Sequence, residues 1–203
     1  MTPVRARGVA SEVVAEVLLF HHAQGLTPGV KAFADELRAA GHTVHTPDLY
    51  DGKTFDTVDD GVAHARELGF GTLLDNGVAA ADDLPEELVY AGFSLGGMPA
   101  QKLAQTRPGA RGALMFHAAL PLSEFGGSWP AGAPLQIHFM EDDPWAEEDL
   151  PAARKIADTV DGAELFLYPG DRHLFADNSV ADYDPGAAAL LKQRALDLLA
   201  RVG

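Results

Sequence analysis

The sequence predicts an α/β protein: a three-layer α/β/α sandwich with a mostly parallel sheet of about six strands. Three observations support this fold class. Short apolar runs alternate with segments of helical periodicity along the chain. Hydrophobic residues make up 47% of the sequence and charged residues 22%, which suits a sheet covered on both faces. The 203 residues fit a single domain, expected over residues 1–203, because one core usually extends to ~250 residues.

The first half of the chain reads as strand, helix, strand and a broken helical stretch. Residues 13–20 (VVAEVLLF) form an apolar run of strand length that ends in turn-forming residues. Apolar residues recur at helical spacing over 28–40, with proline at the start and Gly41 just past the end. A brief β-branched strand is expected at 42–47, and one helix with a broken second piece at 58–74.

The second half continues the alternation with clearer boundaries. Apolar runs of strand length alternate with amphipathic segments, and glycine or proline lies near their boundaries. We expect strands at 88–93, 113–117, 135–140 and 164–168, and helices at 95–106, 149–160 and 185–202. Ligands of such parallel sheets bind at the carboxyl ends of the strands, so the functional loops are expected there.

Composition excludes several classes of function. The formal net charge of −15 repels phosphate backbones and anionic lipids, so neither nucleic acid nor membrane is an expected partner. The chain has no cysteine, which excludes disulfides, thiolate metal sites and a cysteine nucleophile. Met1–Ser11 lacks the apolar core of a signal peptide and no run approaches the ~18 apolar residues of a membrane span, so we expect a cytoplasmic protein.

The sequence GFSLGG, residues 92–97, matches the G-x-S-x-G motif. It lies directly after an apolar strand and opens a helix, where a nucleophilic serine projects from a tight turn. Ser94 is therefore the predicted nucleophile, and the fold is predicted to be that of the α/β-hydrolases. The alternative is a glycine-rich turn that only lets the helix pack closely on the sheet.

An acid and a histidine follow in the chain order that this fold requires. Asp143 lies in the loop EDDPW after the strand at 135–140 and is the preferred acid; Asp142 and Asp171 are its rivals, which spacing alone does not separate. His173 lies in the loop before the final helix. It would act as general base for Ser94, with the acid stabilising the imidazolium.

The remaining candidates surround this triad. The oxyanion hole is expected from the backbone N–H groups of Leu95, after the nucleophile, and Ala23, after the first strand. The adjacent pair His21 and His22 could suggest a metal, but no third ligand stands at a suitable spacing, so no metal is expected and His22 is assigned to the pocket wall. The substrate pocket would further include His117 and Trp145, with a buried structural role as the alternative for His117.

Together these residues resemble the dienelactone hydrolase family. The segments HHAQG, PDLYDG, GFSLGG, MEDDPW and YPGDRHLF occur in family order, and the resemblance spans Val13 to Arg201. It implies that Ser94, Asp143 and His173 occupy the triad positions, with serine in place of the family's nucleophilic cysteine.

The sequence departs from the family pattern at two further positions. His22 stands in place of a glutamate, and Asp177 in place of a substrate-binding arginine. A carboxylate facing an anionic ligand would repel it, so a neutral or cationic ester is expected in place of dienelactone itself.

The predicted function is hydrolysis of a small carboxylic ester or lactone through an acyl-serine intermediate, without cofactor. An acyltransferase or thioesterase with the same triad is the first alternative. A non-catalytic protein that binds a small ligand in the same pocket is the second, because a fold does not by itself imply chemistry.

Overall fold

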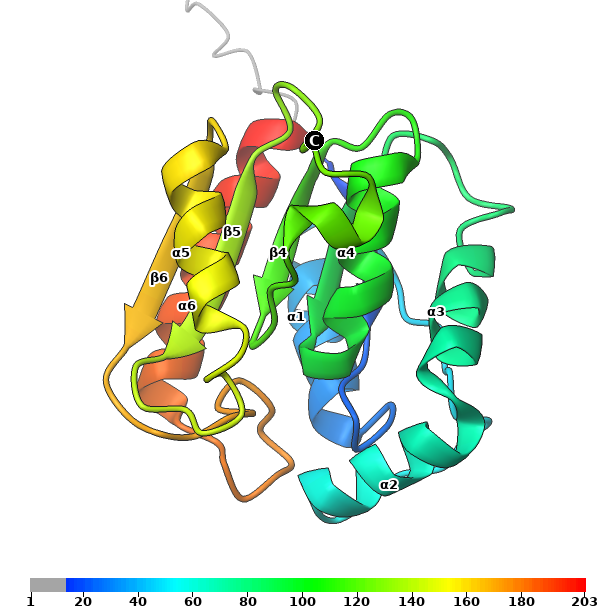
Figure 1. Cartoon of the computed structure of the whole chain (residues 1–203), viewed down its shortest axis with the longest axis vertical. Coiled ribbons are helices and arrows are strands. Elements are labelled where there is room, and N and C mark those ends of the chain that lie inside the picture. The colour runs from blue at the N-terminus through cyan, green and yellow to red at the C-terminus, as the bar shows by residue number, and fades with distance from the viewer. Residues whose placement is uncertain (1–13) are drawn as a thin grey trace, which may run out of the picture.

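The computed structural model describes residues 14–203 and contains one six-stranded sheet (Figure 1). The strand order is β2-β1-β3-β4-β5-β6, and every neighbouring pair is parallel. The strands are β1 Glu16–Phe20, β2 Thr43–His45, β3 Val89–Phe93, β4 Gly112–Phe116, β5 Leu135–Met140 and β6 Ala163–Tyr168. Val13, expected at the start of the first strand, and Met1–Ser11 lie outside the described residues.

Helices cover both faces of the sheet, which confirms the three-layer architecture. In Figure 1 helices α4 and α5 lie in front of the sheet, and α1 and α6 lie behind it. The α-helices are α1 Pro28–Ala39, α2 Val58–Leu68, α3 Phe70–Ala79, α4 Gly97–Thr106, α5 Leu150–Thr159 and α6 Pro185–Val202. Two short 3₁₀ turns, η1 Ser94–Gly96 and η2 Leu122–Phe125, complete the described elements.

The alternation of side chains along each strand produces two separate cores. Val17 and Leu19 of β1 belong to the cluster formed with α1 and α6, whereas Leu18 and Phe20 belong to the cluster formed with α4 and α5. Successive side chains of a strand point to opposite faces, so strands that are apolar at every position fill both cores. This explains why β3 and β4 are almost wholly apolar and why β3, β4 and β5 are buried at every residue, with Gln136 and His138 as the buried polar residues of β5.

The elements differ from the sequence-based expectation at a few positions. In place of one helix and a broken piece at 58–74 there are two complete helices, α2 and α3, the second of which ends at Ala79; Gly69, with φ of 87°, ends α2 and precedes α3. The expected helix at 95–106 begins with the turn η1 before α4. His117 lies just beyond β4 in a left-handed conformation with φ of 62°, and η2 was not anticipated.

All six strands run in one direction, so the loops that follow them meet at one edge, the lower edge in Figure 1. The loops after β1, β3, β4, β5 and β6 carry the candidate site residues. Within residues 14–203, no helix combines the length and apolar character needed to cross a membrane.

Candidate active site

Ser94 lies at a sharp turn between β3 and α4. Its φ of 46° places it in the left-handed region, which non-glycine residues occupy rarely. The glycines at 92 and 96 make the turn possible, because a Cβ at Gly92 would lie 2.2 Å from the Gly96 carbonyl oxygen and a Cβ at Gly96 would lie 2.6 Å from the His21 carbonyl oxygen. The side chain of Ser94 is thereby raised above the end of the sheet and stays partly exposed.

A continuous hydrogen-bonded chain joins Ser94, His173 and Asp143. The distance from His173 Nε2 to Ser94 Oγ is 2.8 Å, and the distance from His173 Nδ1 to Asp143 Oδ2 is 2.7 Å. His173 is 4% exposed and Asp143 is 3% exposed, so water does not compete strongly for these bonds. The three residues come from different loops: His173 lies 79 positions after Ser94 and 30 positions after Asp143 in the sequence.

The structure distinguishes Asp143 from the two other carboxylates considered. Asp142 and Asp171 are exposed, and the hydrogen bonds of the His173 ring go to Asp143 and Ser94 instead. The second oxygen of Asp143, Oδ1, accepts a hydrogen bond of 2.9 Å from the Trp145 N–H, which fixes the plane of the carboxylate. The backbone N–H of Asp142 instead donates to the Gly170 carbonyl at 2.9 Å and ties the acid loop to the histidine loop.

The loop after β1 is compact and well hydrogen-bonded around Ala23. The Gly25 N–H donates to the His22 carbonyl at 3.0 Å, and the Gln24 N–H donates to His22 Nδ1 at 3.2 Å. Among the hydrogen bonds of residues 14–203, none occupies the Ala23 N–H. Of the two predicted oxyanion donors, Ala23 lies in the loop after β1, and Leu95 lies in the turn η1 directly after Ser94.

His21 is held as a neutral ring by its neighbours. Its Nδ1 donates to the His22 carbonyl at 2.8 Å and its Nε2 accepts from the Leu49 N–H at 3.0 Å. Burial lowers the pKa of His21 to about 4, which keeps the ring uncharged at neutral pH. Both ring nitrogens are occupied, and no group of three or more potential metal ligands occurs among the described residues.

The expected pocket-wall role of His22 is wrong, because its side chain has no exposed surface. Its Nε2 lies 2.7 Å from Asp177 Oδ2 and its Nδ1 accepts from Gln24. Asp177 itself is 1% exposed, so the idea that its carboxylate faces a ligand is also wrong. Burial alone would raise the pKa of Asp177, but hydrogen bonds from His22 and Thr27 outweigh it and lower the pKa to about 2.

The two other predicted pocket residues have different environments. Trp145 is 43% exposed and its ring centroid lies 6.0 Å from that of His173, so it covers the histidine on the solvent side. His117 is 2% exposed, with its ring 5.8 Å from His173 and 4.6 Å from Phe175. His117 is thus buried, as expected for a structural histidine. Neither of its ring nitrogens has a hydrogen-bond partner, however, so its polar atoms are unsatisfied.

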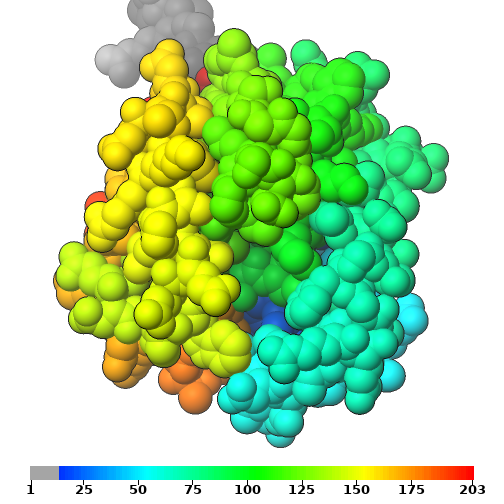
Figure 2. Space-filling view, in the orientation of Figure 1, coloured from blue at the N-terminus to red at the C-terminus, as the bar shows by residue number. Residues whose placement is uncertain are grey.

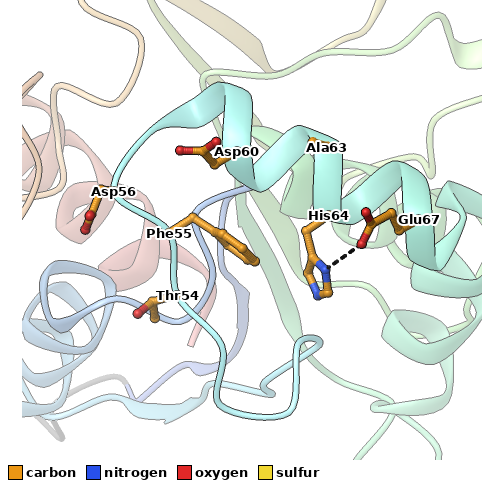
Figure 3. A pocket seen from close by; sticks show the side chains of 7 residues that line it. All are labelled: Thr54, Phe55, Asp56, Asp60, Ala63, His64 and Glu67. Carbon is orange, nitrogen blue, oxygen red and sulfur yellow. Dashed lines mark ion pairs between the residues drawn. The ribbon is translucent and has the colours of Figure 1, made fainter.

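Two depressions mark this end of the molecule. Figure 2 shows a hollow between the cyan helices α2 and α3 and the yellow segment around α5, with blue and green atoms at its floor. A second pocket of about 350 Å³ lies on α2 and the loop before it (Figure 3). Its lining includes Asp56, Asp60 and Glu67, with His64 directed toward Glu67 at 3.7 Å, and none of the predicted site residues belongs to it.

Comparison with known protein families places almost the whole chain in one of them. The sequence model of the dienelactone hydrolase family matches residues 5–203. The chain belongs to the dienelactone hydrolase family. Membership makes it a hydrolase of the α/β fold, in agreement with the resemblance seen in the sequence.

Solved structures of related folds agree with this assignment. A dienelactone hydrolase-like promiscuous phosphotriesterase from metagenomic libraries is 19% identical, with a TM-score of 0.73 over 95% of this chain and 88% of its own. The dienelactone hydrolase from Anabaena variabilis is 21% identical, with a TM-score of 0.63 over 96% and 89%. A thermophilic esterase from Thermogutta terrifontis, with propionate bound, is 16% identical, with a TM-score of 0.66 over 99% and 87%. At these identities the likeness concerns the fold.

Two supporting residues were not singled out from the sequence. Thr27 donates its hydroxyl to Asp177 Oδ2 at 2.5 Å and also caps helix α1, and Ser179 donates its N–H and its hydroxyl to Asp177 Oδ1, each at 2.7 Å. The position of Thr27 before Pro28 is a recognisable capping signal, but its bond to Asp177 joins residues 150 positions apart and has no local signature.

Proposed function

We propose that this hydrolase cleaves a small carboxylic ester or lactone through an acyl-serine intermediate. The observation that carries the proposal is the unbroken chain from Ser94 Oγ to His173 and from His173 to the Asp143 carboxylate. Such a chain removes the serine proton as the nucleophile attacks. A non-catalytic pocket would not need these three side chains within hydrogen-bond distance of one another, so the geometry disfavours the binding-protein alternative.

The proposed reaction follows from the positions of these groups. Ser94 Oγ attacks the ester carbonyl carbon while His173 Nε2 accepts its proton, and Asp143 stabilises the resulting imidazolium. The N–H groups of Ala23 and Leu95 would donate to the oxyanion of the tetrahedral intermediate. The C–O bond to the alcohol then breaks as His173 returns the proton to the leaving oxygen. A water molecule, deprotonated by His173, hydrolyses the acyl-serine in the same way.

The substrate class in this proposal is a small, uncharged ester or lactone. The position of the family's substrate-binding arginine is occupied by Asp177, whose buried carboxylate offers a ligand no positive charge. The net charge of −15 further disfavours an anionic substrate. One structure with a similar fold is an esterase with propionate bound, which is consistent with a short acyl group.

The direct test compares the wild type with Ser94→Ala. We expect wild-type protein to hydrolyse p-nitrophenyl acetate and to react with a fluorophosphonate at Ser94. In the variant we expect no labelling and a kcat at least about 10³-fold lower. The proposal would be refuted if the wild type is not labelled at Ser94 and if its turnover is the same as that of the variant. A panel of matched ester, thioester and acyl-acceptor substrates then separates esterase from thioesterase and acyltransferase activity.

A further inference from the structure

We propose that Asp177 and His22 are positioning residues that fix the oxyanion hole, by holding the backbone around Ala23 in the orientation needed for its N–H to donate. This inference rests on the proposed function, because it assumes an oxyanion at Ser94. It assigns a role to a buried carboxylate that the triad does not use. The carboxylate lies four residues after His173, so the same loop that carries the general base would also fix the hole.

The hydrogen bonds that join Asp177, His22 and the loop after β1 allow only one position for the proton on the His22 ring. The Gln24 N–H can only donate, so His22 Nδ1 must carry no proton when it accepts this bond at 3.2 Å. The single proton of the neutral ring is then on Nε2, where it is donated to Asp177 Oδ2 at 2.7 Å. The carboxylate thus selects the histidine tautomer that can bind the backbone of the oxyanion loop.

Asp177 is itself held firmly by the start of helix α1. Thr27 donates to Oδ2, and the N–H and hydroxyl of Ser179 donate to Oδ1. The Ser179 hydroxyl oxygen also accepts from the Gly29 N–H at 3.0 Å. Gly29 lets the carboxylate approach the helix, since a Cβ there would lie 1.7 Å from Asp177 Oδ1. The position of His22 is therefore set by a group that cannot easily move.

Asp177→Asn would break this network even though it preserves size. Each oxygen of Asp177 accepts from two donors, whereas the NH₂ that replaces one of them in asparagine can only donate. The Ser179 N–H cannot reorient, so the new NH₂ group would face His22. The ring could accept from this NH₂ only by moving its proton to Nδ1, where it would oppose the Gln24 N–H. Either the hydrogen bond between His22 and residue 177 is then lost, or the backbone around Ala23 moves.

The kinetic test compares Asp177→Asn with Asn178→Ala on p-nitrophenyl acetate and on an aryl trifluoromethyl ketone, which forms a serine hemiketal with an oxyanion. We expect Asp177→Asn to lower kcat by about 10- to 100-fold and to weaken ketone binding by a similar factor, with KM changed less than about threefold. Asn178→Ala truncates an exposed side chain next in the sequence that takes no part in this network, and it should stay within about threefold of wild type in all three quantities. An unchanged kcat in Asp177→Asn, an equal loss in Asn178→Ala, or a loss confined to KM would overturn the inference.

A second measurement remains informative if Asp177→Asn does not fold. The ¹⁵N chemical shifts of the neutral His22 ring in the wild type and in Ser94→Ala should report a proton on Nε2 and none on Nδ1 between about pH 7.5 and pH 8. A proton on Nδ1 in this range would overturn the inference. This readout does not depend on turnover, whereas failure of the proposed function would appear as Ser94-independent activity.

Discussion

The Asp143 carboxylate has two distinct partners, one for each oxygen. Oδ2 receives the bond from His173 Nδ1 at 2.7 Å and Oδ1 receives the backbone bond from Trp145 at 2.9 Å. The carboxylate therefore faces the ring of His173 in an orientation set by the backbone of its own loop. In the proposed reaction this selects the histidine tautomer with a free lone pair toward Ser94.

Replacement of Asp143 tests this arrangement. Asp143→Asn would place an NH₂ group against either the Trp145 N–H or the His173 ring and favour the wrong tautomer, so we expect kcat for p-nitrophenyl acetate to fall by about 10³- to 10⁴-fold. Asp142→Asn, at an exposed position next in the sequence, is the matched control and should retain kcat within about threefold. Equal effects of the two substitutions would argue against Asp143 as the acid.

The turn between β3 and α4 depends on the close approach of its backbone to strand β1. A Cβ at Gly96 would lie 2.7 Å from Phe20 Cβ as well as 2.6 Å from the His21 carbonyl oxygen. Both atoms belong to β1 or to the residue directly after it, which cannot shift without disturbing the sheet. The turn at Ser94 is thus built against β1, and this places the loop after β1 beside the nucleophile.

Gly96→Ala should therefore destabilise the protein and disturb the site. We expect the free energy of unfolding to fall by about 2–4 kcal/mol, because backbone and Cβ atoms have no room to move. Gly71→Ala is the matched control, since nothing lies within 4 Å of a Cβ at this exposed position in α3. It should raise the free energy of unfolding by up to about 1 kcal/mol. Urea denaturation of both variants measures the difference, and equal effects would show that the turn tolerates a side chain.

Helices and strands were predictable where their patterns are local. Helix α6 and strand β5 have the expected bounds, because their apolar periodicity and flanking proline or glycine involve only neighbouring residues. Helix α3 was not anticipated in full, since its glycines lower helix propensity and its stability depends on packing. Gly77 shows this dependence, because a Cβ there would lie 2.5 Å from Pro99 on helix α4.

The whole molecule contains several histidines that burial keeps neutral. Burial lowers the pKa of His21 to about 4 and, together with the charge of Arg194, that of His138 to about 3. Burial, with the nearby His173, also lowers the pKa of His117 well below its usual value. Unfolding exposes these rings to water, where each binds a proton below about pH 6.5.

We therefore expect the protein to lose stability in mild acid. The unfolded chain binds more protons than the folded one between about pH 6.5 and pH 4, so the free energy of unfolding falls as pH falls through this range. The loss is up to roughly 2 kcal/mol for each of the three histidines between pH 7 and pH 5. Urea denaturation at several pH values measures it.

His117→Phe provides the control for this prediction. Phenylalanine removes one titrating ring and the two unpaired nitrogens, so the pH-dependent loss should shrink by about a third. A free energy of unfolding that is constant from pH 7 to pH 5 would show that these histidines are not buried neutral.

The sequence by itself determined the fold class, the order of the elements and the turn at Ser94. Hydrophobic alternation, glycine spacing and the position of a motif between strand and helix act over a few residues, so they can be read without knowing the neighbours in space. The sequence also indicated the family, because several short segments occur together in order.

Only the tertiary structure decided which polar groups meet. Spacing did not separate Asp143 from Asp142, whereas the direction of the chain after β5 turns one carboxylate inward and leaves the other exposed. The contact between His22 and Asp177 joins residues 155 positions apart, and it exists because β1 and the segment after β6 end at the same edge of the sheet. Such pairings depend on strand order and loop path, which a local pattern does not record.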